Sequence, residues 1–437
     1  MRIKINICSL LLVILFILSN CTIYQIKNVP YDFTDRVFEH IKILTDFGER
    51  TAEKPSQSKT INYIKKFFIK HGLSESIDPF EVTVTNHKVK KIEINGNSVK
   101  PHEIIFSRQM NQEPLIAKAI FLNHYEIYEK IKSEQADLKI VITKYPVNRK
   151  NIKNLKTQAV VILKEKDYMY LKKNNQNEIL IDYKKFETQE KSFNITGSIN
   201  STRKQAKNIL LTAHWDSYNS TGANDNASGI GVMLELARLI RLNNFNLPFN
   251  FHFIAFGEEE DGLLGSKAYV NKYYHDLKDN CIFLLNIDVV GGHNEKLRIE
   301  TNINEKRNTY KKTGLVFPYP MTRYDYREKE INTTLKNSSD YISFQTSVPD
   351  WLMELLEETS RKTKIQYIKH GAISSDIRSF MAVNVPATSV SIFGGHLHCY
   401  SDNIYMINKP SLAKAGRYCL KLLQEVTAFQ IKNIKDK

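Results

Sequence analysis

The stretch that decides the fold is NILLTAHWD at residues 208–216. A short apolar run is followed at once by a polar group, His214-Trp215-Asp216. An apolar strand of this kind is typical of a sheet that is buried on both faces. A helical pattern comes next, because apolar residues recur on one face at Ile230, Met233, Leu234, Ala237 and Ile240. We therefore expect a strand, a polar loop and a helix that covers the sheet.

The same alternation continues to the end of the chain. Apolar strand patterns occupy residues 249–256, 282–287 and 387–392, and helical patterns follow Gly265 and cover residues 351–363 and 411–428. Two more helices are expected between Asp35 and Gly72, before the first strand. Alternation of this kind predicts an α/β fold with a mainly parallel, mixed sheet and helices on both faces. Such folds bind ligands at the carboxyl ends of their strands.

A region of different character interrupts this pattern. Between residues 84 and 187 the apolar runs are short and strand-like, at residues 91–94, 119–122, 139–142 and 159–162, with polar loops between them. We expect an inserted β-rich lobe over residues 84–187. The main domain would then be discontinuous, with residues 32–83 and 188–432.

Acidic residues and histidines gather where the predicted strands end. His214 and Asp216 follow the first strand, Glu258-Glu259-Glu260 follow the second, and Asp288 follows the third. Asp225 lies in the loop before the first covering helix, and His396 and His398 follow the last strand. A single histidine at a strand end is more often a hydrogen-bonded surface residue, but these residues would all reach one crevice.

Carboxylates and imidazoles in one crevice are the ligands of a hydrolytic metal pair. Each ion needs nitrogen or oxygen ligands and an open position, and one carboxylate can bridge two ions about 3.5–4 Å apart. Without a metal, buried carboxylates would cost roughly several kcal/mol each in desolvation.

Five motifs in this order resemble the zinc-dependent aminopeptidases, a family that also includes glutamate carboxypeptidases and glutaminyl cyclases. They are His214-x-Asp216, the loop GANDNASG at 222–229, EEDGLLGS at 259–266, Asn286-Ile287-Asp288, and His398-x-x-x-Asp402. The resemblance covers residues 35 to about 75 and 208 to the end, and the lobe resembles a protease-associated domain only loosely.

The resemblance implies a role for each residue. Two zinc ions would be bound, one by His214 and Asp288 and the other by Glu260 and His398, with Asp225 as the bridge. Glu259 would be the general base for a zinc-activated water. Asp216 would act through His214 by fixing its tautomer. Glu258 stands where a small residue is commoner, and is expected to be structural or to add negative charge.

Two departures from the family leave the oxyanion donor open. Relatives often carry a tyrosine where this chain has Leu397, and Ser375-Asp376-Ile377 replaces a common Ser-Asp-His. Tyr400 is a candidate substitute. His396 is the alternative to His398 as last ligand, and the later Asp402 favours His398.

The N-terminus carries an export pattern. Arg2 and Lys4 precede an apolar run, Leu10–Leu18, that is too short to span a bilayer, and the run ends at Leu18-Ser19-Asn20-Cys21. We expect residues 1–20 to be a lipoprotein-type signal peptide and Cys21 to carry the only membrane attachment, so that the protein faces the periplasm or the cell exterior. The alternative is a cleaved secretory signal with Cys21 incidental.

Composition limits the remaining classes. The chain has 437 residues, of which 42% are hydrophobic and 25% charged, as in ordinary globular proteins. The net charge of +15 comes from scattered lysines, so we expect no nucleic-acid partner. Cysteine spacing supports neither a disulfide framework nor a thiolate metal site.

The predicted function is removal of N-terminal residues from peptides, which makes the chain an enzyme and peptides its partners. The alternatives are a glutaminyl cyclase or a carboxypeptidase on the same scaffold, or an inactive surface lipoprotein that keeps the fold for binding. The sequence leaves the preferred N-terminal residue and the oligomeric state open.

Overall fold

The computed structural model describes residues 28–107, 113–122, 140–145, 147, 159–243, 248–292, 341–345, 348–370, 375–392 and 397–435. The expected signal peptide, Cys21 and His396 lie outside these residues, so export and a lipid anchor stay predictions. Across the described part of the chain, no helix combines the length and apolar character needed to cross a membrane.

Four parallel strands lie side by side at one end of the main sheet. They are β8 (Asn208–His214), β9 (Asn250–Phe256), β10 (Cys281–Ile287) and β13 (Ala387–Val390), and they lie in the order β13-β10-β8-β9. β7 (Glu178–Ile199) pairs with β9 in the antiparallel direction. The parallel strands therefore bring their carboxyl ends to one edge, while the sheet as a whole is mixed.

Helices cover both faces of this sheet. One core contains side chains of α2 (Phe33–Asp46), α3 (Pro55–Lys70), α7 (Ser228–Leu242), α11 (Asp350–Thr363) and α13 (Lys409–Lys435), and the other contains those of α8 (Leu264–Asn280) and α12 (Ile377–Met381). Successive residues of β8 alternate between the two cores: Ile209 and Leu211 enter the first, and Leu210 enters the second. The predicted α/β fold class is confirmed.

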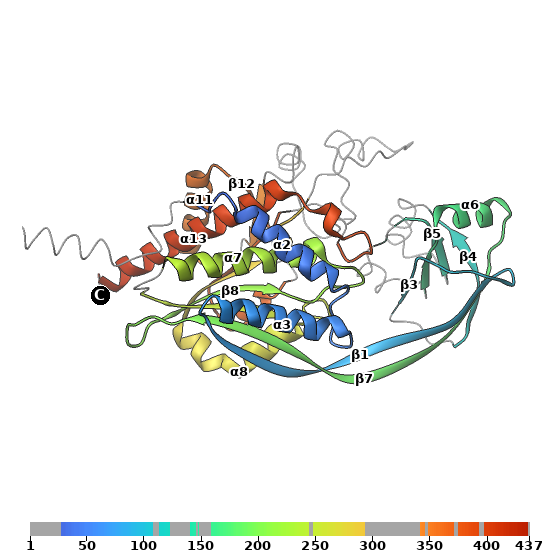
Figure 1. The fold of residues 1–437 in the computed structure, drawn as a ribbon, viewed down its shortest axis with the longest axis horizontal. Coiled ribbons are helices and arrows are strands. Elements are labelled where there is room, and N and C mark those ends of the chain that lie inside the picture. The colour runs from blue at the N-terminus through green and yellow to red at the C-terminus, as the bar shows by residue number, and fades with distance from the viewer. Residues whose placement is uncertain are drawn as a thin grey trace, which may run out of the picture.

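Two long strands carry the chain away from this body (Figure 1). β1 (Ser74–Ile94) pairs with β7 along nearly its whole length, and at the far end lie β2 (Asn97–Ser98), β3 (Glu103–Phe106), β4 (Leu115–Phe121), β5 (Ile140–Thr143), β6 (Ala159–Ile162) and α6 (Glu165–Lys173). We call these elements and the outer parts of β1 and β7 the lobe. It has a core of its own, with Ile94, Ile140, Val161 and Ile181 among its members. The predicted boundaries at 83/84 and 187/188 fall inside β1 and β7.

The lobe also touches the loop that leads to α13. The ring of Tyr400 meets the ring of His102 edge-on, with 4.1 Å between centroids. Tyr400 packs on a small apolar cluster of the lobe, which consists of Ile105, Leu122, Val141, Val147, Val160 and Ile162. A short parallel pair, β11 (Tyr341–Gln345) and β12 (Gln366–His370), lies apart from the main sheet.

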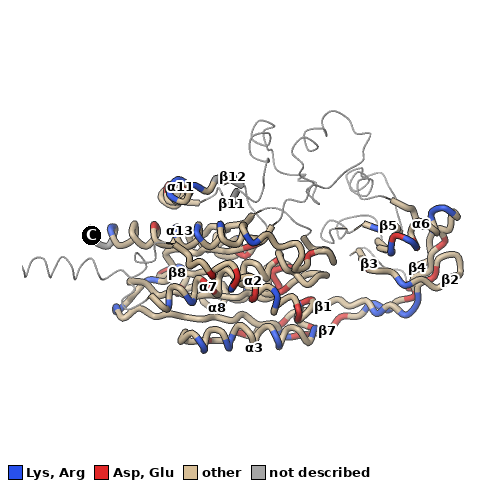
Figure 2. The backbone as a smooth tube through the Cα atoms, turned by 45° about the horizontal axis from the view of Figure 1, so that its top comes forward, with Lys and Arg blue, Asp and Glu red and all other residues tan. Residues whose placement is uncertain are grey.

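Charged residues of both signs are interleaved along the chain. Figure 2 shows Lys beside Asp and Glu around α6, whereas the charged residues of α3 are lysines. Cys281, Cys399 and Cys419 are buried free thiols. Burial raises the pKa of Cys281 and Cys399 to about 12, so these two thiols stay protonated at neutral pH.

Candidate metal centre

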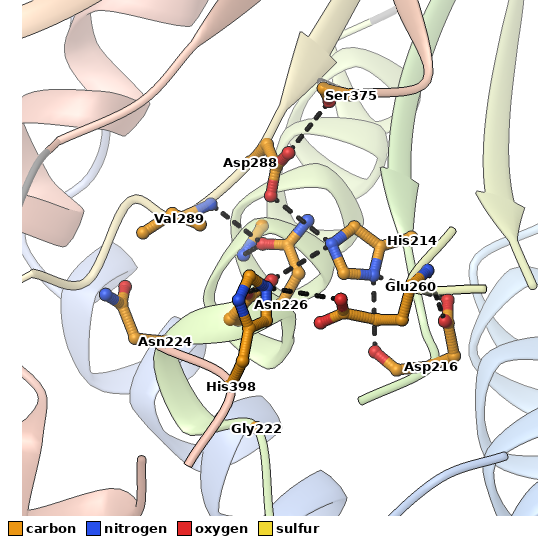
Figure 3. Close-up of polar contacts among 12 residues, drawn as sticks. His214, Asp216, Gly222, Asn224, Asn226, Glu260, Asp288, Val289, Ser375 and His398 are labelled. Atoms are coloured by element: carbon orange, nitrogen blue, oxygen red, sulfur yellow. Dashed lines mark hydrogen bonds and ion pairs between the residues drawn. The ribbon is translucent and has the colours of Figure 1, made fainter. Parts of the chain in front are cut away.

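The strand ends bring the predicted site residues together. His214 is the last residue of β8, Asp288 follows β10, and Glu259 and Glu260 lie in the loop between β9 and α8. Asp225 lies in the short helical turn η2 (Ala223–Ala227) that leads into α7. All of them, and His398, are buried. Figure 3 shows the side chains of His214, Glu260, Asp288 and His398 pointing toward one another.

Two groups of side chains have the spacing to hold a metal ion. In each group the ligand atoms lie within 4.8 Å of one another: His214, Asp225 and Asp288 form the first, and Asp225, Glu260 and His398 form the second. Asp225 belongs to both. Its Oδ1 lies 3.1 Å from Nε2 of His214, and its Oδ2 lies 2.8 Å from Nε2 of His398. One carboxylate therefore offers one oxygen to each group.

The chemistry of the first group fits a cation better than hydrogen bonds. Nε2 of His214 lies 3.1 Å from Asp225 Oδ1 and 3.3 Å from Asp288 Oδ1, although a ring nitrogen can donate only one proton. Ligand atoms about 2.0–2.2 Å from a tetrahedral zinc ion lie roughly 3.3 Å apart, which is the spacing observed. In the second group Glu260 Oε2 lies 3.2 Å from His398 Nε2.

The electrostatics of the cluster also favour positive charge at its centre. Burial lowers the pKa of His214, but hydrogen bonds that the protonated ring donates to Asp216, Asp225 and Asp288 outweigh burial and hold that pKa well above its usual value. Burial likewise raises the pKa of Asp225, yet His398 and His214 hold it well below its usual range. The carboxylates thus bind a proton or a metal ion between them.

Asp216 contacts residues of both groups. Nδ1 of His214 lies 3.2 Å from the backbone carbonyl oxygen of Asp216 and 3.3 Å from its Oδ1, which leaves Nε2 directed at Asp225 and Asp288. The other oxygen, Oδ2, accepts the backbone N–H of Glu260 at 3.0 Å. Asp216 therefore links a ligand of the first group to a ligand of the second.

Ser375 contacts Asp288 from the other side. Its hydroxyl donates to Asp288 Oδ2 at 2.8 Å, and the amide of Asn286 donates to the serine oxygen at 2.7 Å. Only Oδ1 of Asp288 then faces His214. The Ser375-Asp376-Ile377 segment, noted as a departure from the family, thus still orients a ligand.

Asp402 and Arg50 hold the backbone of the site, and their contacts were not predicted. Asp402 accepts the N–H of Asn224 at 2.8 Å and the N–H of Asp225 at 3.0 Å. Arg50 is fully buried and donates to the carbonyls of Trp215 at 2.7 Å and Gly222 at 3.0 Å. Both residues fix loops that carry ligands, through backbone groups that have no signature in sequence.

Glu258 proves to be tied to β7. Its backbone has a φ of +54°, a left-handed conformation that is unusual for a residue with a side chain, and the Ser192 hydroxyl donates to its Oε1 at 3.0 Å. Burial, together with the charge of Asp216, raises its pKa well above the usual value. Tyr400 places its ring against His102 of the lobe, and nothing in these contacts tests it as an oxyanion donor.

Comparison with known proteins agrees with the fold and the order of motifs. Residues 194–350 match the family model of peptidase family M28. This segment of the chain is similar to peptidase family M28. The predicted resemblance to zinc aminopeptidases is thereby confirmed.

Several known proteins match part of the chain in sequence. Aminopeptidase YwaD of Bacillus subtilis is 41% identical over 130 residues, which is 28% of this chain and 26% of that protein. The alkaline phosphatase isozyme conversion protein of Escherichia coli is 32% identical over 113 residues, 22% of this chain and 32% of that protein. The human BOS complex subunit NCLN is 30% identical over 145 residues, 28% of this chain and 26% of that protein. The match thus spans about a quarter to a third of these relatives' lengths.

Solved structures share the fold over most of the chain. A zinc aminopeptidase from Bacillus subtilis superposes with a TM-score of 0.65 at 21% identity, covering 91% of this chain and 96% of that one. An M28 peptidase precursor from Shewanella amazonensis gives a TM-score of 0.60 at 13% identity, covering 91% and 94%. The shared fold therefore extends well beyond the segment that matches the family model in sequence.

Proposed function

We propose that this protein is a zinc-dependent aminopeptidase that removes N-terminal residues from peptides with two zinc ions. The observation that carries the proposal is the position of Asp225, whose two oxygens face two separate groups of ligands. A single-metal site would need only one of these groups.

The residues divide the work as follows. His214 and Asp288 would hold one ion, Glu260 and His398 would hold the other, and Asp225 offers one oxygen to each group. When bound, the zinc ions lower the pKa of a water molecule to about 7 and polarise the scissile carbonyl. Glu259 takes a proton from the attacking water and gives it to the leaving amine. Asp216 keeps the proton of His214 on Nδ1, so that Nε2 stays available as a ligand.

Substrate selection follows from the charge of the site. Glu259, Glu260, Asp216 and Asp288 are buried around the site. A protonated N-terminal amine would find carboxylates there, whereas a free C-terminal carboxylate would meet charge of its own sign. We therefore favour an aminopeptidase over a carboxypeptidase.

The rivals are a glutaminyl cyclase and a protein that keeps the fold only for binding. One relative is named as a subunit of a complex, so likeness to the family alone carries no activity. Against a binding role stands the complete ligand set with Glu259 beside Glu260. Decay of catalytic function would be expected to remove a ligand or the base first.

The test is zinc content together with turnover of amino-acid arylamides, for wild type and Glu259→Gln. We expect two zinc ions per chain in both proteins and turnover lower by about 10²–10⁴-fold in the variant, because only the proton carrier is lost. Asp261→Asn is the matched control, since Asp261 is exposed in the same loop, and its turnover should stay near that of wild type.

Blocked peptides separate the rivals. An aminopeptidase cleaves a peptide with an amidated C-terminus and leaves an N-acetylated one intact, and a carboxypeptidase does the reverse. Ammonia released from N-terminal Gln would identify a cyclase. A wild-type protein with two zinc ions that acts on none of these substrates would support the binding role, and one without zinc would refute the metal centre.

A further inference from the structure

Glu258, Glu259 and Glu260 lie in a loop whose two ends are Gly257 and Gly265. The side chain of Asn194, from β7, holds these two ends together, and we call this point the neck. The Asn194 amide donates to the carbonyl of Gly265 at 2.9 Å, and its oxygen accepts the N–H of Gly257 at 3.2 Å. The N–H of Gly265 donates to the carbonyl of Gly257 at 3.0 Å. Asn194 is 1% exposed. One buried amide therefore joins the first and last residues of the loop.

The neck has no room for other side chains. A Cβ on Gly265 would lie 2.3 Å from the carbonyl oxygen of Gly257 and 2.5 Å from the side-chain oxygen of Asn194. A Cβ on Gly257 would lie 2.7 Å from Ser192 Oγ and 2.9 Å from the Trp215 ring. Because neither glycine has a side chain, Gly257 and Gly265 approach each other closely enough for Asn194 to contact both residues.

The rest of the loop is fixed by contacts that depend on this closure. The N–H groups of Gly262 and Leu263 donate to the carbonyl of Glu259 at 3.0 and 2.9 Å, and that of Leu264 donates to the carbonyl of Glu258 at 3.0 Å. The N–H of Glu260 donates to Asp216. The backbone of all three glutamates is thus held by the far half of the loop or by Asp216.

We propose that Asn194 is a positioning residue for Glu259 and Glu260. It acts through the neck: losing its two hydrogen bonds lets Gly257 and Gly265 separate, and the backbone of the glutamates then shifts relative to Asp225 and His398. The inference rests on the proposed function for the role of Glu259, whereas the role of Glu260 as a ligand can be tested by metal binding alone.

The chain supplies a control for Asn194. The partly buried Asn250 also joins two backbone groups. The side-chain oxygen of Asn250 accepts the N–H of Ser201 at 2.9 Å, and its amide donates to the carbonyl of Ala206 at 3.1 Å. Asn250 begins β9, at the end of the sheet opposite the site. Asn250→Ala therefore removes these two hydrogen bonds, and a third to Asn208 Oδ1 at 2.9 Å, without touching the loop.

The experiment compares wild type, Asn194→Ala, Asn194→Asp and Asn250→Ala. Asn194→Asp keeps the shape and the acceptor for Gly257 but loses the donor to Gly265, so it covers the case in which Asn194→Ala fails to fold. The measurements are kcat and KM on arylamides, affinity for each zinc ion by chelator competition, hydrogen exchange of the 257–265 peptide, and Tm.

We expect both Asn194 variants to lose about 10–100-fold in kcat with KM nearly unchanged, and affinity for one of the two zinc ions to fall by a similar factor. Their 257–265 peptide should exchange faster. Asn250→Ala should lower Tm while kcat, zinc affinity and exchange of that peptide stay as in wild type.

Two outcomes would overturn the inference. One is a pair of Asn194 variants with lower Tm but unchanged kcat, zinc affinity and loop exchange. The other is an equal loss of kcat in Asn250→Ala. If wild type shows no turnover at all, the proposed function fails, and zinc affinity with hydrogen exchange still decides whether Asn194 positions Glu260.

Discussion

Asp225 can bridge two ions only if its carboxylate is held between them. The side chain that fixes its backbone is Asp402, which accepts the N–H of both Asn224 and Asp225. Asn226, next in the chain, accepts the N–H of Gly229 at 2.9 Å and donates to the carbonyl of Ile287 at 3.0 Å. The bridging residue is therefore anchored on both sides, to the loop before α13 and to the end of β10.

Replacing Asp402 tests this anchor at a single residue. Asp402→Asn puts an NH₂ group against one of two N–H donors, so one hydrogen bond is lost and the loop of Asp225 loosens. We expect zinc affinity to fall by about 10–100-fold, measured by competition with a chromophoric chelator. Asp350→Asn, an exposed carboxylate on α11, is the control. Equal zinc affinity in wild type and Asp402→Asn would contradict the assignment.

The proposed ligand residues could be selected from the sequence because they lie at or beyond the ends of apolar strands or before a helix, where the fold itself sets their place. Asp402 was noted only as part of a motif, and Arg50 and Asn194 were missed as parts of the site. These three act on backbone N–H and C=O groups that are distant in sequence, and no spacing pattern records such a partner. Asn194-Ile195-Thr196 does fit a glycosylation triplet, but its burial excludes a glycan.

At the scale of elements, a buried polar network joins α2 to α7. Nε2 of His40 lies 3.2 Å from Glu235 Oε1, and Nε of Arg238 donates to Glu235 Oε2 at 2.7 Å. Burial raises the pKa of Glu235, but the hydrogen bonds from His40 and Arg238 outweigh it, so the net effect lowers that pKa. The network holds the helix that follows the Asp225 loop.

The lowered pKa predicts a pH dependence of stability. Glu235→Gln should cost about 3 kcal/mol of unfolding free energy, because Arg238 stays buried without its partner. A depressed acid pKa stabilises the fold above the unfolded value of about 4.3, and this contribution is lost as the pH falls further. The difference between wild type and variant should thus be constant above about pH 5 and shrink below about pH 4.

Urea unfolding of chelator-treated protein measures that difference without interference from zinc loss. Glu39→Gln on the exposed side of α2 serves as control and should change stability by less than about 0.5 kcal/mol. A wild-type advantage that does not diminish at low pH would show that packing, and not charge, makes the contribution.

At the scale of the molecule, stability and metal binding are linked. The proposed ligands come from the end of β8 and from segments that follow β8, β9, β10 and β13. Zinc binds only when those segments are in place, so it stabilises the folded state by about 4 kcal/mol at 1,000 times its Kd. Removal of zinc by a chelator should lower Tm by several degrees, and added zinc should restore it. Asp288→Asn, which weakens one ion site, should show a smaller shift, and an unchanged Tm in wild type would argue against folding-linked binding.

The sequence predicted the layered body better than it predicted the path to the lobe. Strand patterns with apolar runs were recognised, but most of β1 and β7 alternates polar and apolar residues on a surface exposed to solvent. Their pairing depends on partners about 100 residues apart, which local periodicity cannot reveal. The proposed lobe boundaries consequently fell inside two continuous strands.

Because β1 and β7 pair with each other on the way to the lobe, the lobe could be replaced by another domain. β1 and β7 keep one register from Ser74 opposite Ser198 to Val89 opposite Tyr183, and Val82 lies opposite Glu190. A two-residue Asn-Gly hairpin turn could replace residues 83–189 and join Val82 to Glu190, so that the pairing of β1 with β7 would end there. The pairing of β7 with β9 would stay intact. Protein engineers could use the same point to graft a different domain beside Tyr400.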